Sequence, residues 1–304
     1  MSLGNVAKYI ESFGLLLNLV TLCLILRQGL KSPDMQLALI LAVCDVCLVS
    51  SKLGLYIYYK TTNDFGIFKK EWFGQLDGLF MCLFISTSIL CVGYLALLRC
   101  WAIFFKRRIN IKVWFRFFAA QQGLLAFLLT LTAVNGEFKL SPFDRFFHPN
   151  PYSLNPVTRS CSLLLSLWIL FSFVAVNVTY PAICYVYLHQ IDTAAICLDW
   201  RPKIIARHHF LKKITIILRI SILMLIYNIF MLPAFVITMK GYIQHQNNSV
   251  TLDSLLTLSL LCLVIVNPLT LIFLHQDIIN DVKIIFHSMF RPKLPTDIQI
   301  HPSL

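Results

Sequence analysis

Seven long apolar stretches, separated by short polar connections, constrain the fold of this chain more than any other feature. A membrane-crossing helix needs about 20 mostly apolar residues. Such stretches lie near residues 10–27, 35–59, 75–105, 113–135, 162–189, 214–239 and 252–275. Hydrophobic residues make up 58% of the 304 positions and charged residues 13%, against roughly 45–50% and 25% in soluble domains. We therefore predict an all-α integral membrane protein, a seven-transmembrane helix bundle.

The basic residues predict the orientation of the bundle. With the N-terminus outside, fifteen Lys and Arg residues fall in inner segments and eight in outer ones, as the positive-inside rule requires. The formal net charge of +12 then reflects an anionic membrane surface, and we expect no nucleic-acid partner. This orientation places Asn247, in an Asn-Asn-Ser glycosylation sequon, outside. We expect a multi-pass protein of the plasma membrane.

Residues 277–290 predict one further helix, of a different kind. Apolar residues recur there at helical spacing, with Asp281 and Lys283 between them. This pattern is typical of an amphipathic helix on a membrane surface. We expect one membrane domain over residues 1–290, including this helix, and a short cytoplasmic tail over 291–304.

Four polar side chains are predicted to lie in the middle of apolar spans. Asp45 is about ten residues from either end of the second span, and Asn18, Ser88 and Asn267 are mid-span in the first, third and seventh. Polar groups in hydrocarbon are costly and often functional, so we expect them to form one hydrogen-bonded cluster. Two interpretations stay open, a polar contact that joins helices and a site for a small cation.

Other residues within the spans are also unusual. Arg99 lies near the inner end of the third span, and two interpretations are open. It can be a functional residue, or its side chain can simply extend to the membrane surface. Pro181, Pro233 and Pro268 lie inside spans and predict helix kinks. Kinked helices around a polar core suit a bundle that changes shape, although static bundles also contain kinks.

These positions resemble the motifs of the rhodopsin-like (class A) G-protein-coupled receptors, in order and spacing along all seven spans. The matches are Asn18, Leu41-Ala42-x-x-Asp45, Ser88, Arg99 within 98–103, Pro233 and Asn267-Pro268, together with Ile89, Pro181 and Tyr227, which match the trio that links ligand pocket and core. The resemblance implies a receptor that senses a ligand at its outer half and activates a heterotrimeric G protein at its inner half.

The resemblance also implies roles for individual residues. Asn18, Asp45, Ser88 and Asn267 would form the sodium-linked core, with a sodium ion at Asp45 and Ser88 as the only cofactor. The residues expected to meet the G protein are Arg99, Lys106, Arg107, Lys212 and Lys213. The expected partners are thus a G protein, a small-molecule ligand and the lipid bilayer.

Several positions depart from the family pattern. The acid expected before Arg99 is Leu98, the acid expected low on the sixth helix is Lys213, and the sixth-helix tryptophan is Met231. Arg99 therefore lacks both usual partners of the inactive state, and our hypothesis is that this state is weakly stabilised. Cys161 stands where the family has a disulfide cysteine, but its usual partner at the top of the third helix is missing, which argues against that disulfide.

The outer half predicts the class of ligand. Met81 stands where amine receptors carry aspartate, which argues against an amine ligand. The seventh span has no lysine for a retinal Schiff base, which argues against retinal. Lys52 is open to three interpretations: an anionic ligand, a salt bridge to Asp77, or a side chain that extends outward. The other expected pocket residues, Met81, Ile85, Tyr227 and Met231, suit a small hydrophobic ligand.

Other classes of protein fit less well. No Gly-rich phosphate loop, His-Glu-x-x-His or Gly-x-Ser-x-Gly motif is present, so we expect no enzyme. The competing hypothesis is a seven-helix transporter or channel, against which the few charges within the spans and the single-copy motifs argue. A receptor-like protein that does not signal is the third possibility.

Overall fold

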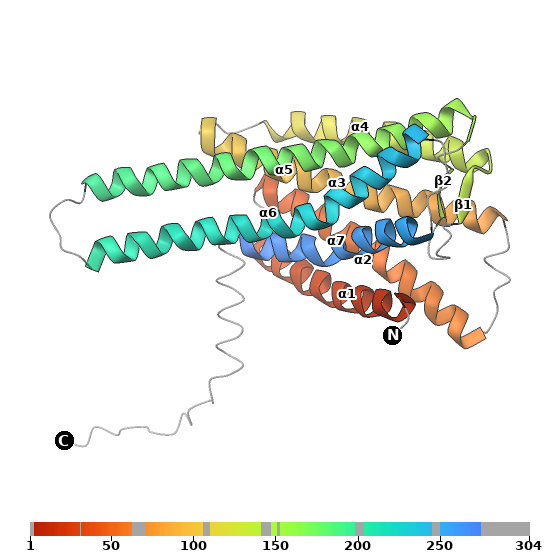
Figure 1. The fold of residues 1–304 in the computed structure, drawn as a ribbon, viewed down its shortest axis with the longest axis horizontal. Helices are drawn as coiled ribbons and strands as arrows, with labels where there is room; N and C mark the ends of the chain where they lie inside the picture. Colours follow the sequence, from red (N-terminus) through yellow and green to blue (C-terminus); the bar gives the residue numbers. More distant parts are fainter. Residues whose placement is uncertain are drawn as a thin grey trace, which may run out of the picture.

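The computed structural model describes residues 3–30, 32–62, 71–105, 110–140, 147–150, 153–197, 204–244 and 250–274. These residues form seven helices and one small hairpin (Figure 1). In chain order the elements are α1 (Leu3–Gln28), α2 (Pro33–Thr62), α3 (Glu71–Phe105), α4 (Ile111–Val134), β1 (Phe138–Leu140), β2 (Phe147–Pro149), α5 (Pro156–Cys197), α6 (Ile204–Gln244) and α7 (Val250–Leu274).

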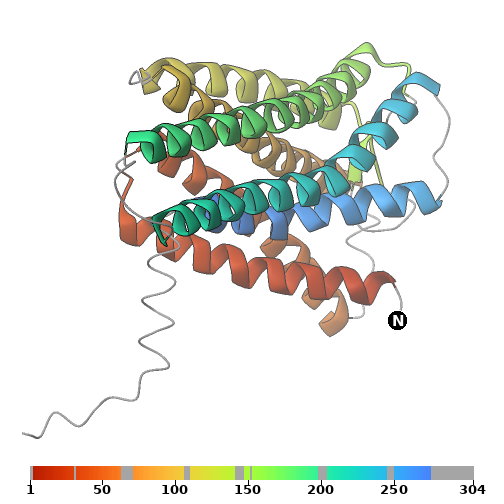
Figure 2. The ribbon, with the colours of Figure 1, turned by 60° about the vertical axis from the view of Figure 1, so that its left-hand side comes forward.

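Consecutive helices run in opposite directions and pack side by side as one bundle (Figures 1 and 2). One end holds the β1–β2 hairpin, and we call it the hairpin end. At the other end α1, α3, α5 and α7 finish and α2, α4 and α6 begin; we call it the arginine end, because Arg99 lies near it.

Six of the helices are long and apolar enough to cross a membrane, and α7 contributes a shorter apolar stretch, Leu258–Ile272. The chain is thus a multi-pass helical membrane protein. α3 is its central helix, since 67% of the most apolar segment of α3 is buried inside the bundle, against 22% of the corresponding segment of α4. Side chains on α3 are therefore the ones that most other helices can reach.

α5 and α6 are longer than hydropathy alone predicts. We expected spans near 162–189 and 214–239, but the helices cover 42 and 41 residues and project beyond the other helices at the arginine end (Figure 1). The added segments 190–197 and 204–213 contain no proline or glycine, so nothing in them breaks a helix. Hydropathy detects only the part of a helix that lies in lipid.

The connection between α4 and α5 contains the hairpin. β1 and β2 are antiparallel, with Phe138 opposite Pro149. Gln75 of α3 holds β1 by two hydrogen bonds: its Nε2 donates to the Phe138 carbonyl at 3.1 Å, and its Oε1 accepts from the Phe138 amide at 3.0 Å. The Phe138 ring fills the space above Gly78, where a Cβ would come within 2.3 Å of it.

Candidate functional site

The central cluster consists of Asp45, Ser88 and Asn267, from α2, α3 and α7. Ser88 Oγ donates to Asp45 Oδ1 at 2.8 Å, and Asn267 Nδ2 donates to Asp45 Oδ2 at 3.0 Å and to Ser88 Oγ at 2.8 Å. The three residues are 1%, 4% and 2% exposed. The expected polar cluster therefore forms at these three positions and joins three helices in the middle of the bundle.

Asn18 lies beside this cluster but is held differently. Its Nδ2 donates to the carbonyl of Gly14, one turn earlier on α1, at 2.9 Å, and to the carbonyl of Val264 on α7 at 2.7 Å. Its Oδ1 accepts no hydrogen bond from the residues that the structure describes. The prediction of a four-residue cluster is thus wrong for Asn18, whose amide joins α1 to the α7 backbone three residues before Asn267.

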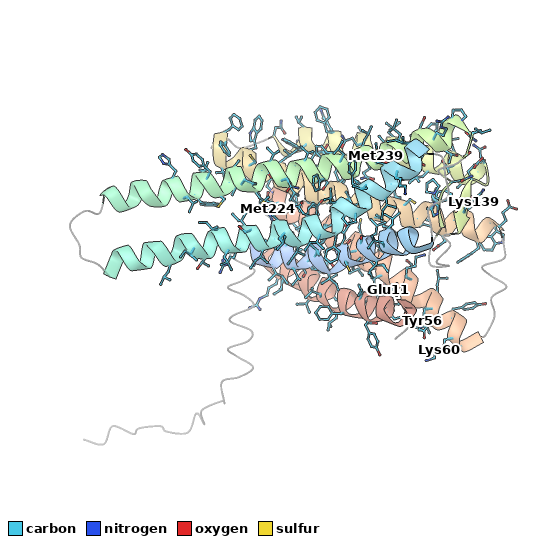
Figure 3. All side chains as sticks on the ribbon, in the orientation of Figure 1. Glu11, Tyr56, Lys60, Lys139, Met224 and Met239 are labelled. Atoms are coloured by element: carbon cyan, nitrogen blue, oxygen red, sulfur yellow. The ribbon has the colours of Figure 1, made fainter. Side chains whose placement is uncertain are left out.

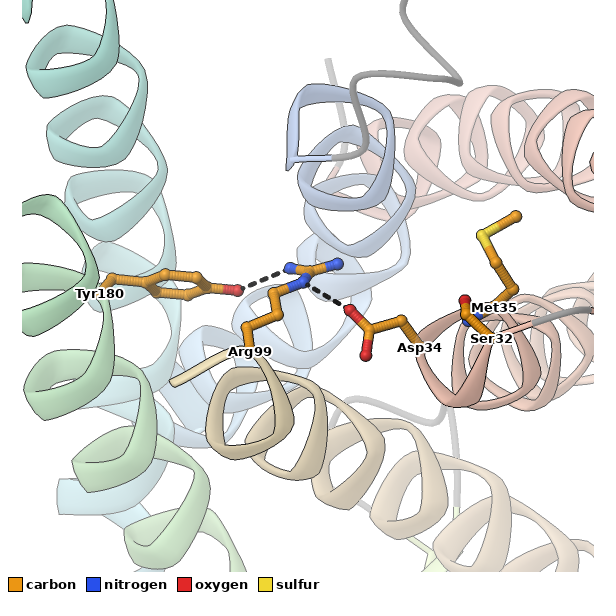
Figure 4. A network of polar contacts seen from close by, with 5 residues as sticks. All are labelled: Ser32, Asp34, Met35, Arg99 and Tyr180. Carbon is orange, nitrogen blue, oxygen red and sulfur yellow. Dashed lines mark hydrogen bonds and ion pairs between the residues drawn. The ribbon is translucent and has the colours of Figure 1, made fainter. Parts of the chain in front are cut away.

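The arginine network consists of Arg99, Asp34 and Tyr180, from α3, α2 and α5 (Figure 4). Arg99 Nε donates to Asp34 Oδ2 at 3.3 Å, and Arg99 Nη1 donates to Tyr180 Oη at 3.1 Å. Asp34 is held by the start of its helix: Ser32 is the N-cap, with its Oγ accepting from the Met35 amide at 3.3 Å. A first-turn acid is favourable beside the positive end of a helix dipole.

This network gives Arg99 an acidic partner in place of the two usual ones that the sequence lacks. Leu98, the residue before Arg99, is an apolar side chain that is 3% exposed, so it supplies no acid. The acid comes instead from α2, 65 positions away along the chain. Sequence reasoning missed Asp34 because it lies between the first two apolar stretches, where a charged residue is not conspicuous.

α5 and α6 are joined by polar contacts that sequence reasoning also missed. Asn177 and Asn228 exchange two hydrogen bonds, each of 2.8 Å between Nδ2 and Oδ1. The hydroxyls of Ser172 and Tyr227 lie 2.7 Å apart. The sequence did contain a signal for these contacts, because these four residues are also polar residues within apolar spans. These three hydrogen bonds tie the middle of α6 to α5.

The structure buries only two members of the expected coupling trio. Ile89 and Tyr227 are each 4% exposed and belong to the main core, whereas Pro181 is exposed on α5. Its neighbour Tyr180, also 4% exposed, points into the bundle and reaches Arg99. The α5 residue that contacts the core is therefore one position earlier than the resemblance implies.

Lys52 forms a salt bridge with Asp77, one of the three interpretations of this lysine. Its Nζ lies 3.0 Å from Asp77 Oδ2, and the two side chains are 11% and 8% exposed. Glu11 of α1, near the hairpin end (Figure 3), is 2% exposed. Nearby, the ammonium of Lys8 lies 3.8 Å from the centre of the Tyr56 ring.

The apolar residues expected to line a ligand pocket are packed in the bundle. Met81 and Ile85 pack with Leu48 and Val264 in a small cluster of their own. Met231 is fully buried, and Tyr227 is occupied by the Ser172 contact. The structure does contain a cavity of about 390 Å³, but it lies between α6 and α7 toward the arginine end.

The remaining expectations fall on parts of the chain that are not described. Lys106, Arg107 and Asn247 lie outside the described residues, as do the expected helix 277–290 and tail 291–304. Lys212 and Lys213 lie on α6, but their side chains are not described.

Cys161 is a buried free cysteine. Among the described residues no group of three or more His, Cys, Asp or Glu side chains could hold a metal ion.

Comparison with known proteins gives no family. No protein-family model matches the chain, and no curated protein matches it either. A functional assignment therefore depends on the two polar networks and on the arrangement of the helices around them.

Proposed function

We propose that this chain is a seven-helix receptor of the plasma membrane, with its N-terminus outside, that responds to a small ligand and activates a heterotrimeric G protein. The observation that carries the proposal is the central cluster, since Asp45, Ser88 and Asn267 come together from α2, α3 and α7 at the positions of the receptor-like motifs. A purely structural contact needs no carboxylate in the middle of a membrane.

The central cluster suits a small hard cation. Carboxylate and hydroxyl oxygens are the ligands that such ions prefer, and Asp45 and Ser88 supply both types in one buried place. Asn267 donates its amide hydrogens to both oxygens. A sodium ion held there by Asp45 and Ser88 would neutralise the buried carboxylate.

The arginine network is the proposed restraint on signalling. Arg99 is the residue that would meet the G protein, and it must first leave Asp34 and Tyr180. Because α5 and α6 share three hydrogen bonds between side chains, a movement of α6 pulls on α5 and on its Tyr180. The ligand shifts this equilibrium only by its different affinity for the two states.

The proposed ligand is small and hydrophobic, and it binds in the half of the bundle nearer the hairpin end. Lys52 already has Asp77 as its partner, so an anionic ligand would have to displace a buried carboxylate. Met81, Ile85 and Met231 carry no charge, so a hydrophobic ligand would only have to separate them from the side chains that they pack against. Thermal-shift screening of lipids and small volatile compounds against the purified protein would identify the ligand class.

Reconstitution in liposomes with a panel of purified G proteins tests the proposal. We expect ligand-free nucleotide exchange above that of empty liposomes, and we expect Arg99→Ala to abolish it. Arg116→Ala, which removes an exposed arginine of α4 near the same end, is the matched control. Ion or solute flux that is unaffected by Arg99→Ala, without any exchange, would overturn the receptor proposal in favour of transport.

A further inference from the structure

The cavity between α6 and α7 has apolar walls and opens to the lipid-facing surface. Its volume of about 390 Å³ lies within the range of roughly 300–1,000 Å³ of small-molecule sites. Leu218 and Ile222 of α6 border it and are 54% and 45% exposed. Val266 of α7, on the opposite wall, is 3% exposed. The cavity thus reaches from the surface of the bundle to its core. It lies beside the segment of α6 that contains Met224, which is labelled in Figure 3.

Among the side chains that the structure describes, a single cation lines this largely apolar space. Arg219 is the third residue of the apolar part of α6, Ile217–Lys240, and it is partly buried. No hydrogen bond or ion pair joins its guanidinium to any residue within the described part of the chain. Thr215, one turn earlier on α6, also lines the cavity, but its hydroxyl donates to the Leu211 carbonyl at 2.8 Å. An arginine at this depth is costly unless an anion meets it.

The geometry points to a binding site for one anionic phospholipid, with its phosphate at Arg219 and one acyl chain between Ile222 and Val266. The positive charge of Arg219 matches the headgroup of such a lipid, and the apolar walls match its acyl chain. The exposed rim places the entrance of the cavity against the bilayer, which supplies the lipid. Arginine is well suited to phosphate, because its planar group donates two parallel hydrogen bonds. Basic sites between membrane helices bind anionic headgroups by the same chemistry.

The position of the site connects it to the central cluster. Val266 and Leu269 line the cavity and flank Asn267 and Pro268 on α7. A lipid bound there packs against the same turn of α7 that presents Asn267 to Asp45, and against the α6 segment that precedes Pro233. The site therefore holds α6 and α7 in the described arrangement. It does not depend on the receptor proposal, since a transporter would bind the lipid equally well.

Native mass spectrometry of the purified full chain tests this site. The probes are phosphatidylglycerol and phosphatidylcholine with identical acyl chains, and dodecanoate as a free fatty acid. We expect phosphatidylglycerol to be retained and Arg219→Gln to weaken its binding about fivefold. Arg116→Gln, which removes an exposed arginine outside the cavity, should change binding by less than about twofold. Equal retention of both phospholipids, or retention of dodecanoate alone, would overturn the proposal.

A bulky side chain tests the acyl-chain position independently of charge. Ile222→Trp should fill the entrance and reduce phosphatidylglycerol retention, whereas Ile229→Trp, at a position of α6 that is 54% exposed and outside the cavity, should not. A photo-crosslinking amino acid at position 222 should yield a phospholipid adduct. Cross-linking to residues 275–304 of the same chain instead would show that the protein itself covers the cavity, and the lipid site would be refuted.

Discussion

The central cluster and the arginine network each join α3 to two other helices, but they differ in burial. The side chains of Asp45, Ser88 and Asn267 are at most 4% exposed, and their hydrogen bonds are 2.8 to 3.0 Å long. Asp34 is 27% exposed and lies 3.3 Å from Arg99. A buried polar group that loses its partner costs far more than a partly exposed ion pair. We infer that the first network contributes more to the stability of the bundle, and that the second is the weaker restraint, which opens more readily when the bundle changes state.

The largest expected effect comes from breaking the central cluster. Asn267→Leu removes one donor from Asp45 and one from Ser88, leaving a buried carboxylate with fewer partners. We expect a loss of about 2–3 kcal/mol in the free energy of unfolding, seen as a melting midpoint lowered by roughly 5–10 °C in detergent.

Thr270→Val is the matched control on the same helix. The Thr270 hydroxyl donates only to the Val266 carbonyl of its own helix, at 2.8 Å, so its loss should lower the midpoint by about 2 °C or less. Equal shifts for the two variants would show that the cluster adds nothing beyond local helix stability.

An intermediate effect is expected at the buried side of the arginine network. Tyr180→Phe removes the hydroxyl that accepts from Arg99 and leaves the ring in place, at a cost of about 1 kcal/mol. Differential scanning fluorimetry should show a midpoint roughly 2–4 °C lower. Tyr185→Phe, on the same helix but 71% exposed, should leave the midpoint unchanged, and a loss as large as that of Tyr180→Phe would contradict a specific contact.

The smallest effect on stability is expected for the salt bridge itself. Asp34→Asn should cost about 0.5 kcal/mol, because the pair is partly exposed. Melting in 1 M salt, where the Debye length is about 3 Å, should remove most of the difference between Asp34→Asn and the unmodified chain. The deficit of Asn267→Leu should persist in the same buffer, and a deficit that salt also removes would erase the distinction between the two networks.

The two networks also differ in how far the sequence predicted them. Asp45, Ser88 and Asn267 were expected together because a polar residue in the middle of an apolar span is conspicuous and needs partners. Asp34 and Tyr180 were not expected at Arg99. Asp34 lies outside the apolar stretches, where charge is ordinary, and a tyrosine in a span carries no signal of its direction. Which face of a helix turns inward depends on packing between helices that the sequence does not show.

The helices themselves illustrate the same limit. Hydropathy located all seven helices, because each has an apolar segment, but it did not show that α5 and α6 continue for 42 and 41 residues. Nor did it show the β1–β2 hairpin, whose position depends on the Gln75 hydrogen bonds and on the close approach of Phe138 to Gly78. These are contacts between segments distant in sequence, and no local pattern encodes them.

The most direct test of the account is basal nucleotide exchange by the Asp34→Asn variant in liposomes with a responsive G protein. If Asp34 restrains Arg99, this variant should exchange nucleotide about twofold faster than the unmodified chain, the factor that the roughly 0.5 kcal/mol expected for this salt bridge corresponds to. Adding Arg99→Ala to it should abolish the exchange. Exchange that Asp34→Asn leaves unchanged, or that persists without Arg99, would contradict the claim that the arginine network controls signalling.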